Sequence, residues 1–559
     1  MQQIVYRLAI KGVVGVTAAC SRSLTRLRAM PRSPFSVFAV LYTVALVLEL
    51  GDNWTDPWFT GCFVAAAAVA VVTGMTRLKF LTLLIGSTAY FLLFRFPEVA
   101  NHVNLMLCLN VAMIAVLGTS LVRRRGTGTD AETDTENDYA AIGPILRIGL
   151  ILVYVLAGFH KLNTDYLDPE ASCATSILGS VIGTMGMPVL GVPIVIPVAL
   201  CAALFGYRLA RRGRFARAGN SWFTATVVGL GIAGIAAVAV VLLSWRLGPV
   251  GAVISAFAAV TVIGWELVGG LLLTVPRLQA AIVAISLAMH ATLALVGFVD
   301  FGALAVALLF SFVPPAYLRV LIDGGAVEIG RRTGHRVGLY AGFGFGIALL
   351  CGIDALLRRL PEIAVVSGLL FNLAVLILIW PVLAAVCGPA PRPVWGGVRI
   401  LERRTPAPLY LVPVLLVLLG MTSYLGLRTA GNFSMFSNLR TEAGASNHLL
   451  LSGNPLKLWD YQDDVVWILD IDDRHGRIIH HYDEPPQGHA LPVVEFRKWI
   501  HDWTRAGHRV PMTYGYRGEV HTTADIVTDP RWRTEERTPA MVLQDFRIIQ
   551  PGQPNWCRW

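Results

Sequence analysis

Hydrophobic positions along the chain gather in near-continuous apolar runs that are separated by short polar connections. One helical crossing of a bilayer takes about 20 apolar residues, and many of these runs approach that length. The expected spans lie near 36–50, 58–74, 79–96, 102–121, 141–160, 188–207, 222–244, 249–274, 278–299, 301–319, 337–355, 363–387 and 407–427. Because lipid leaves no partner for open backbone groups, such runs are helical. The pattern predicts an all-α polytopic membrane bundle of about 13 transmembrane helices.

The pattern changes near residue 431, where polar residues become frequent. Two short stretches, 465–471 and 477–482, have β-like sequences, and residues 491–507 carry apolar side chains at helical spacing. We therefore expect a small α+β extramembrane domain over 431–559. It follows a transmembrane domain over 36–430 and a basic amphipathic arm over 1–35, and an acidic stretch at 126–139 is expected to be a flexible loop.

Composition and charge distribution support this interpretation and add an orientation. The chain has 559 residues, of which 55% are hydrophobic and 15% charged, with a net charge of +10. Basic residues gather in alternate connections, which places those connections and the N-terminus in the cytoplasm and the C-terminal domain outside the cytoplasm. The same distribution argues against nucleic acid as a partner. Eight scattered cysteines without metal-ligand spacing indicate neither a metal site nor a disulfide framework.

Ionisable and amide side chains inside or beside the spans are the candidate functional residues, because such groups are costly in a bilayer. The candidates are Asn101 and His102 at the start of one span, His160, Lys161 and Asn163 at the end of the next, and Arg147, Glu266 and His290 within spans. With the expected topology, His102, Lys161 and His290 all come near the outer leaflet. We therefore expect them to line one pocket.

Each candidate also has a structural interpretation. His102 fits an interfacial histidine, and Lys161 fits a side chain that snorkels to the interface or pairs with Asp165. Glu266 and Arg147 fit interhelical pairs, and His290 fits a hydrogen bond to a neighbouring helix. A free lysine has a pKa of about 10.4, so a lysine that acts as a base at neutral pH must be desolvated. Neighbouring helical positions point about 100° apart, so His160 and Lys161 are not expected to face the same ligand.

Several motifs resemble the horizontally transferred transmembrane (HTTM) domain family, which is related to vitamin K-dependent gamma-carboxylases. They are "NHVNLM", "YVLAGFHKLNTDYLDP", "MHATLALVGFVDFGALAVALL" and, in the tail, "MFSNLRTEAGASNHLLL". The resemblance covers about residues 36–320 and part of the tail, and it is closest to the bacterial members. It implies a reduced quinone of the vitamin K or menaquinone type as cofactor, CO2 and O2 as co-substrates, and no metal.

The resemblance also implies roles for particular residues. The family's catalytic lysine corresponds to Lys161, and a histidine that assists later steps corresponds to His102. The chain departs from the animal enzymes at two positions, because His160 stands where they have lysine and Asn163 where they have aspartate. A protein or peptide substrate at the extracytoplasmic face is possible within this scheme, although the tail is much shorter than in those enzymes.

Three functions are therefore compared. The first is a carboxylase-like membrane enzyme that uses a reduced quinone at an outer-leaflet pocket, with Lys161 as base. The second is a non-catalytic membrane protein that binds a lipid or quinone or acts as a scaffold. A transporter ranks last, because the sequence has neither inverted repeats nor paired broken helices. In the tail, Asn438, Arg440 and Glu442 are expected to fix the chain against the last span, or Arg440 and His448 to close the pocket as a lid.

Overall fold

The structure is a computed structural model of the whole chain. It describes residues 33–52, 57–123, 131–185, 248–294, 297–315, 397–402, 404–444, 446–471, 488–532, 538–550, 554–555 and 557. The chain divides into two interleaved compact units. One comprises Met1–Thr88, Asn110–Arg147 and Val283–Pro406, and the other comprises Ala89–Leu109, Ile148–Ile282 and Ala407–Trp559. Each unit is described separately below.

The secondary structure described for the first unit consists of helices. It contains α2 (Pro34–Asp52), α3 (Pro57–Val72), most of α4 (Arg77–Tyr90), the later part of α5 (Asn101–Arg123), the earlier part of α6 (Ala131–His160), most of α13 (Gln279–Ala294) and α14 (Val299–Phe310). Helices α2 and α14 pack against each other. Aromatic rings from α2 and α4 form its interior, where the ring of Phe80 lies 6.0 Å from that of Tyr42 and 5.9 Å from that of Phe35.

Several buried polar groups in the first unit are paired. The hydroxyl of Tyr42 donates to Oδ1 of Asn110 at 2.8 Å, and the amide of Asn110 donates to Thr88 at 3.1 Å. Arg77 and Asp138 form a buried ion pair at 2.6 Å. Asp138 lies on α6, which is already helical from Ala131, so the expected flexible loop at 126–139 is wrong from that residue onward. Its acidic residues are favourable near a helix N-terminus, where the helix dipole is positive.

Four helices of the described residues are long and apolar enough to cross a membrane. They are Arg77–Arg95, Asn101–Val122, Thr135–His160 and Ser255–Leu272. Shorter apolar helices cover Pro34–Leu50, Trp58–Val72, Val299–Phe310 and Ala407–Met421. Their lengths and compositions indicate association with a membrane. The predicted number of about 13 spans is not supported, and the spans expected at 188–207, 222–244, 337–355 and 363–387 lie outside the described residues.

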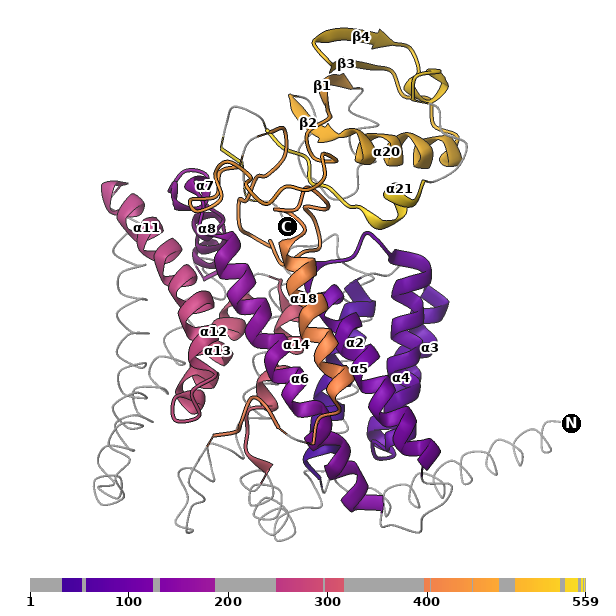
Figure 1. The fold of residues 1–559 in the computed structure, drawn as a ribbon, viewed down its shortest axis with the longest axis vertical. Helices are drawn as coiled ribbons and strands as arrows, with labels where there is room; N and C mark the ends of the chain where they lie inside the picture. The colour runs from indigo at the N-terminus through magenta and orange to yellow at the C-terminus, as the bar shows by residue number, and fades with distance from the viewer. Residues whose placement is uncertain are drawn as a thin grey trace, which may run out of the picture. The chain divides into compact units, whose positions relative to one another are not determined.

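The second unit combines apolar helices with a small antiparallel sheet (Figure 1). Its helical elements are η1 (Phe91–Arg95), the start of α5, the end of α6, α7 (Thr164–Leu167), α8 (Cys173–Met185), α11 (Gly248–Gly264), η3 (Trp265–Gly269), α12 (Gly270–Leu272), η4 (Ala407–Tyr410) and α18 (Leu411–Met421). Elements η1 and η3 are π-helical. Within the partly apolar stretch 174–190, the chain is helical up to Met185, where α8 ends.

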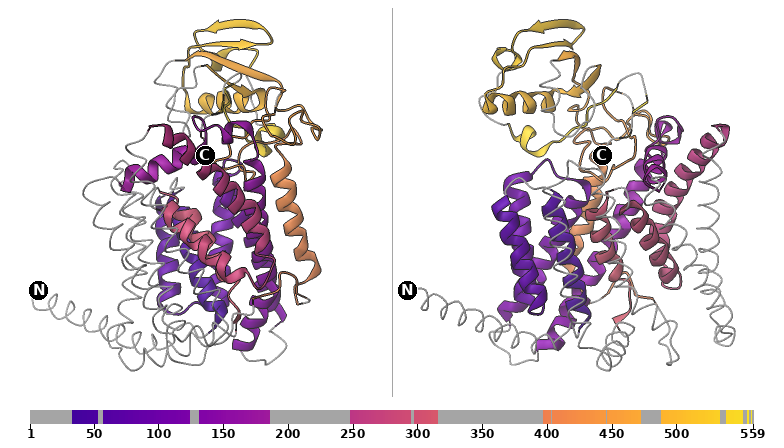
Figure 2. Two further views of the ribbon diagram at one scale, coloured as in Figure 1. Left: turned by 90° about the vertical axis from the view of Figure 1, so that its left-hand side faces the viewer. Right: turned by 180° about the vertical axis from the view of Figure 1, so that it is seen from behind.

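The C-terminal part of the second unit contains a four-stranded antiparallel sheet with the strand order β2-β1-β3-β4. The strands are β1 (Val465–Ile471), β2 (His489–Pro492), β3 (Met512–Tyr516) and β4 (Glu519–Thr523), with α20 (Val493–Ala506), η5 (Ile526–Thr528) and α21 (Pro539–Leu543) beside them. Helix α20 packs on one face of the sheet (Figures 1 and 2). The predicted strand at 465–471 and the predicted amphipathic helix are confirmed, while the stretch 477–482 lies outside the described residues.

A buried cluster of charges connects α20 to two other segments of the second unit. Nζ of Lys498 lies 2.9 Å from Glu495, 3.4 Å from Glu98 and 3.5 Å from Asp545, while Arg428 lies 3.6 Å from Asp545. Burial lowers the pKa of Lys498, but the three carboxylates more than offset this and hold it above its ordinary value. Burial raises the pKa of Glu495 to about 7, against the effect of Lys498.

Candidate functional site

The candidate site is built around Lys161, the residue that directly follows α6. Its side chain is only 3% exposed. Nζ lies 2.8 Å from Oε2 and 3.1 Å from Oε1 of Glu266, and it donates to the carbonyl of Met435 at 3.3 Å. The ring of Tyr166 lies 5.9 Å from the same nitrogen. The amine is therefore dry, as expected for a base, but its partner is Glu266 and not Asp165.

Small residues bring the helices close enough for this pair to form. A Cβ added at Gly158 on α6 would lie 2.8 Å from the backbone nitrogen of Leu267 and 2.9 Å from Cβ of Glu266. A Cβ at Gly270 would lie 3.0 Å from Cβ of Tyr154. Glycine at such crossings lets two backbones approach closely in a membrane. The π-helical turn η3 then presents Glu266 toward the end of α6.

Trp265 adds an unsatisfied polar group beside the pair. Its indole ring packs over Gly269, where an added Cβ would lie 3.1 Å from the ring. Its Nε1 is buried, and no hydrogen-bond partner is found for it among the described residues. A buried N–H without a partner costs free energy unless a ligand or water accepts from it. Tryptophan in an apolar run is not distinctive, so the sequence alone gave this indole no role.

His160 directly precedes Lys161, but its side chain contacts a different helix, α18. Its Nε2 lies 3.0 Å from the carbonyl oxygen of Gly420 on α18, and its ring lies 5.5 Å from that of Tyr424. An added Cβ at Gly420 would lie 2.6 Å from a methyl of Leu156, so α6 and α18 are also in close contact. His160 and Lys161 thus face different partners, in the way that their helical spacing predicts.

Asn163 joins the end of α6 to the tail. Its Oδ1 accepts from the backbone N–H of Tyr166 at 2.8 Å and so caps α7, as asparagine commonly does. Its Nδ2 donates to the carbonyl oxygens of His160 at 2.8 Å and Ser437 at 2.6 Å. One amide therefore fixes both the turn that carries Lys161 and the tail that covers it.

The tail residues Arg440 and His448 make contacts that fix the chain. Nε2 of His448 donates to the carbonyl of Phe159 at 3.0 Å, and its Nδ1 accepts from the backbone N–H of Leu450 at 3.1 Å. Burial lowers the pKa of His448, which favours this neutral form. Arg440 donates to the carbonyl of Gln550 at 3.2 Å. Among the described residues neither side chain is a partner of Lys161, so the lid remains a prediction.

The C-terminal segment is tied to the loop that follows Lys161. Asn438 accepts from the N–H of Cys173 at 2.9 Å and donates to the carbonyl of Asn555 at 2.6 Å. Asp165 accepts from the N–H of Asn555 at 2.8 Å, so its carboxylate binds the tail. Cys173 and Cys557 form a disulfide. The sequence indicated no disulfide framework and did not reveal this single bond, because the two cysteines are separated by 384 residues and no spacing pattern connects them.

The start of α5 also contacts the tail. Oδ1 of Asn101 accepts from the N–H of Phe433 at 2.6 Å, and Nδ2 of Asn104 donates to the carbonyl of Gly431 at 2.7 Å. His102 is half-buried in the same turn. Among the described residues it is not a partner of Lys161, so its assisting role remains a prediction.

Two further candidates, Arg147 and His290, belong to the first unit. Arg147 donates to Glu402 at 3.0 Å and to the carbonyl of Ser311 at 2.9 Å, in agreement with a structural interpretation. His290 is fully buried, and its ring lies 5.0 Å from that of Phe301. Because Lys161 lies in the other unit, the expected convergence of these side chains on one pocket remains a prediction.

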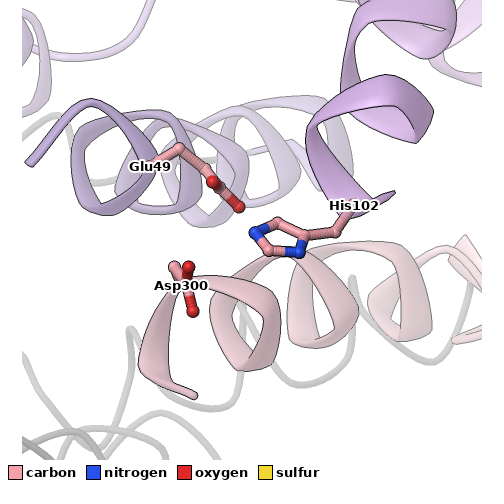
Figure 3. A group of neighbouring side chains, drawn as sticks. All are labelled: Glu49, His102 and Asp300. Carbon is pink, nitrogen blue, oxygen red and sulfur yellow. The ribbon is translucent and has the colours of Figure 1, made fainter. Parts of the chain in front are cut away.

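The first unit also holds two carboxylates that the sequence patterns did not single out. Glu49 of α2 and Asp300 of α14 turn toward each other, with carboxylate oxygens within 4.8 Å (Figure 3). The figure also draws His102, which belongs to the second unit. Two carboxylates at this separation repel each other unless one is protonated or a positive charge balances them. Each of the two carboxylates lies at an end of an apolar run, and this position could have identified them as candidates from the sequence.

Comparison with known proteins adds no relative: no protein family, no curated protein and no solved structure matches this chain.

Proposed function

We propose that this protein is an integral-membrane enzyme of the vitamin K-dependent gamma-carboxylase-like kind, which works with a reduced quinone and uses Lys161 as its base. The observation that carries the proposal is the buried pair of Lys161 and Glu266 at 2.8 Å. Ionisable side chains held away from water in a membrane protein are functional candidates by default. A π-helical turn, frequent at functional sites, supplies one member of the pair.

The residues around the pair fit a reduced quinone. Such a molecule is an apolar ring with two hydroxyl oxygens, so its site needs apolar walls and a few polar groups. Tyr166 and Trp265 supply aromatic surface next to Lys161 and Glu266. The buried Nε1 of Trp265, without a partner among the described residues, is a donor that a ligand oxygen would satisfy.

The pair can supply a neutral amine without exposing a charge. Burial penalises the separated charges of Lys161 and Glu266, and a proton moved from Nζ to the carboxylate leaves a neutral hydrogen-bonded pair. The amine then has a lone pair with which to accept a proton from an acidic hydroxyl group. Met435 holds Nζ in place through its carbonyl. Burial raises the pKa of Tyr166 well above its ordinary value, so its hydroxyl stays protonated. When bound, a reduced quinone would supply a strong base through its reaction with O2, and CO2 would supply the carboxyl group.

The disulfide supports the proposed location of the site. Disulfides form and persist in oxidising compartments and are rare in the cytosol. The bond joins Cys173, which follows the loop after Lys161, to Cys557 in the C-terminal tail, so we propose that this end of α6 and the C-terminal domain lie on the extracytoplasmic side. A peptide substrate would then approach from that side.

The test is quinone oxidation by the purified protein in detergent, combined with extraction and mass analysis of any small molecule that it carries. Lys161→Ala should reduce O2-dependent oxidation of added menahydroquinone by roughly 10²-fold or more, since a general base contributes about that much. Glu266→Gln should also impair turnover. Arg517→Ala, which removes an exposed side chain of the sheet, serves as the control. Unchanged turnover in a folded Lys161→Ala protein would remove the proposal.

A non-catalytic protein that binds a lipid or quinone, or acts as a scaffold, is the second candidate. The observation that favours it is that the amine of Lys161 is already directed at Glu266 and Met435. This candidate expects a bound lipophilic molecule without any turnover. In that case Lys161→Ala would change the assembly or the stability of the protein only.

A further inference from the structure

A short segment of the tail exposes an unusual number of large apolar side chains. This segment, Leu449–Trp459, follows His448 directly. Its exposed side chains are Leu449 (49%), Leu450 (69%), Leu456 (42%), Leu458 (72%) and Trp459 (43%). A polar extramembrane domain rarely leaves such a group in water, because a contiguous apolar patch usually marks a contact with another molecule or a membrane.

Both ends of the segment are fixed next to the ends of membrane helices. The N–H of Leu449 donates to the carbonyl of Leu162 at 2.8 Å, two residues beyond the candidate span Thr135–His160. The N–H groups of Leu458 and Trp459 both lie 3.1 Å from the carbonyl of Leu425, four residues beyond α18. The segment therefore lies at the level where α6 and α18 leave the apolar region.

Gly426 shows how closely the segment lies against the end of α18. It has a φ of +81°, and an added Cβ would fall on the carbonyl oxygen of Trp459. Glycine is required on both counts, since it alone tolerates this backbone conformation without strain and leaves this space. The position of Trp459 is thus fixed by the backbone, and its exposed side chain does not result from a loose loop.

The exposed apolar surface continues from α18 into the segment. Leu411, Val414, Leu415 and Leu418 are all exposed, and their spacing places them on one face of the helix. In an apolar helix that ends at a membrane surface, such a face contacts acyl chains. Leucine and tryptophan side chains that extend this face beyond the helix end match the composition of membrane interfaces, where tryptophan is enriched.

We propose that Leu449–Trp459 lies in the membrane surface, with Leu450, Leu458 and Trp459 inserted at the boundary between lipid headgroups and acyl chains. The occupant of this apolar surface is lipid. Lys457, paired with Asp463 at 2.5 Å, keeps the polar side of the segment turned toward the domain. The segment would thus anchor the tail that covers Lys161, whatever reaction the site performs.

A photo-reactive amino acid at Leu458 or Leu450 tests the proposal in the full-length protein. The protein is reconstituted in phosphatidylcholine nanodiscs, irradiated and analysed by mass spectrometry for lipid adducts. Val520 is the matched control, because its side chain is 68% exposed but lies on β4 of the sheet. We expect lipid adducts at positions 450 and 458 and none at position 520. No adducts at 450 and 458, or crosslinks there only to a second protein copy, would overturn the proposal.

Tryptophan quenching gives a second measurement that does not depend on the unnatural residue. The difference between the fluorescence of the wild type and of Trp459→Phe isolates the emission of Trp459. Phosphatidylcholine brominated on its acyl chains should quench this difference, and more strongly when the bromines are near the headgroup. A difference spectrum that brominated lipid leaves unchanged would contradict the insertion of Trp459.

Discussion

Nζ of Lys161 lies 2.8 Å from Oε2 of Glu266, and both side chains are largely withdrawn from solvent. The two residues are 105 positions apart: Lys161 directly follows α6, and Glu266 belongs to the π-helical turn η3. Their pairing offsets part of the free-energy cost of burying two ionisable side chains. It also sets limits on which substitutions the second unit tolerates.

Removal of one member of the pair should destabilise the protein more than removal of both. Lys161→Met leaves the carboxylate of Glu266 buried without its partner, which typically costs about 3–5 kcal/mol. The double variant Lys161→Met/Glu266→Leu removes both charges and should recover most of that loss. Apparent melting temperatures in detergent provide the measurement. Equal loss in the single and double variants would show that the two side chains do not act as a pair.

Gly158→Ala should separate α6 from η3. The new methyl group would lie 2.8 Å from the backbone nitrogen of Leu267, and overpacking of this kind typically costs about 1–3 kcal/mol. Gly264→Ala is the matched control, because an added Cβ there meets no atom within 4 Å and alanine favours a helix. Thermal unfolding should show a loss for the first variant only. A tolerated Gly158→Ala would argue against the close crossing.

Stability should fall as the pH rises from about 4.5 toward 7, because of Glu495. Burial raises its pKa from 4.5 to about 7, so within this window the folded protein holds a proton that the unfolded chain has released. Across this window the shift lowers the free energy of unfolding by an amount on the order of 3 kcal/mol. Its neighbours Lys498, Asp545 and Glu98 carry the charges that act on it, and Arg428 balances Asp545.

Glu495→Gln should flatten this part of the pH profile, measured as melting temperature between pH 4.5 and 7.5. Glu519→Gln is the control, because the Glu519 side chain is 76% exposed and its removal should leave the slope in place. A slope that persists in Glu495→Gln would assign the effect to another group.

Loss of the disulfide should loosen the C-terminal segment. Cys557→Ser removes a link between residues 384 positions apart, and loss of a native disulfide typically costs about 2–5 kcal/mol. Alkylation followed by mass spectrometry should label Cys173 and Cys557 only after reduction, whereas the exposed thiol of Cys62 should react without it. Labelling of Cys557 in the unreduced protein would disprove the bond.

The apolar runs alone determined most of the helices near the membrane and the strand at 465–471. Both depend on local periodicity, which burial in lipid or against α20 enforces residue by residue. The amphipathic character of α20 was equally visible, since Phe496 and Ile500 lie one helical turn apart. The sequence also singled out the "GFHKLN" stretch as a candidate site, because ionisable groups inside or beside an apolar run are rare in a bilayer.

Only the tertiary structure decided the partners of these groups. Lys161 pairs with Glu266 and not with Asp165, which is nearer in the sequence. The close approach at Gly158 brings η3 to the end of α6, while Asp165 accepts a hydrogen bond from the N–H of Asn555. The disulfide of Cys173 and Cys557 likewise depends on where the tail returns to the helix ends. Such pairings join residues that are more than one hundred positions apart in the sequence, and local hydrophobic periodicity carries no information about contacts at that separation.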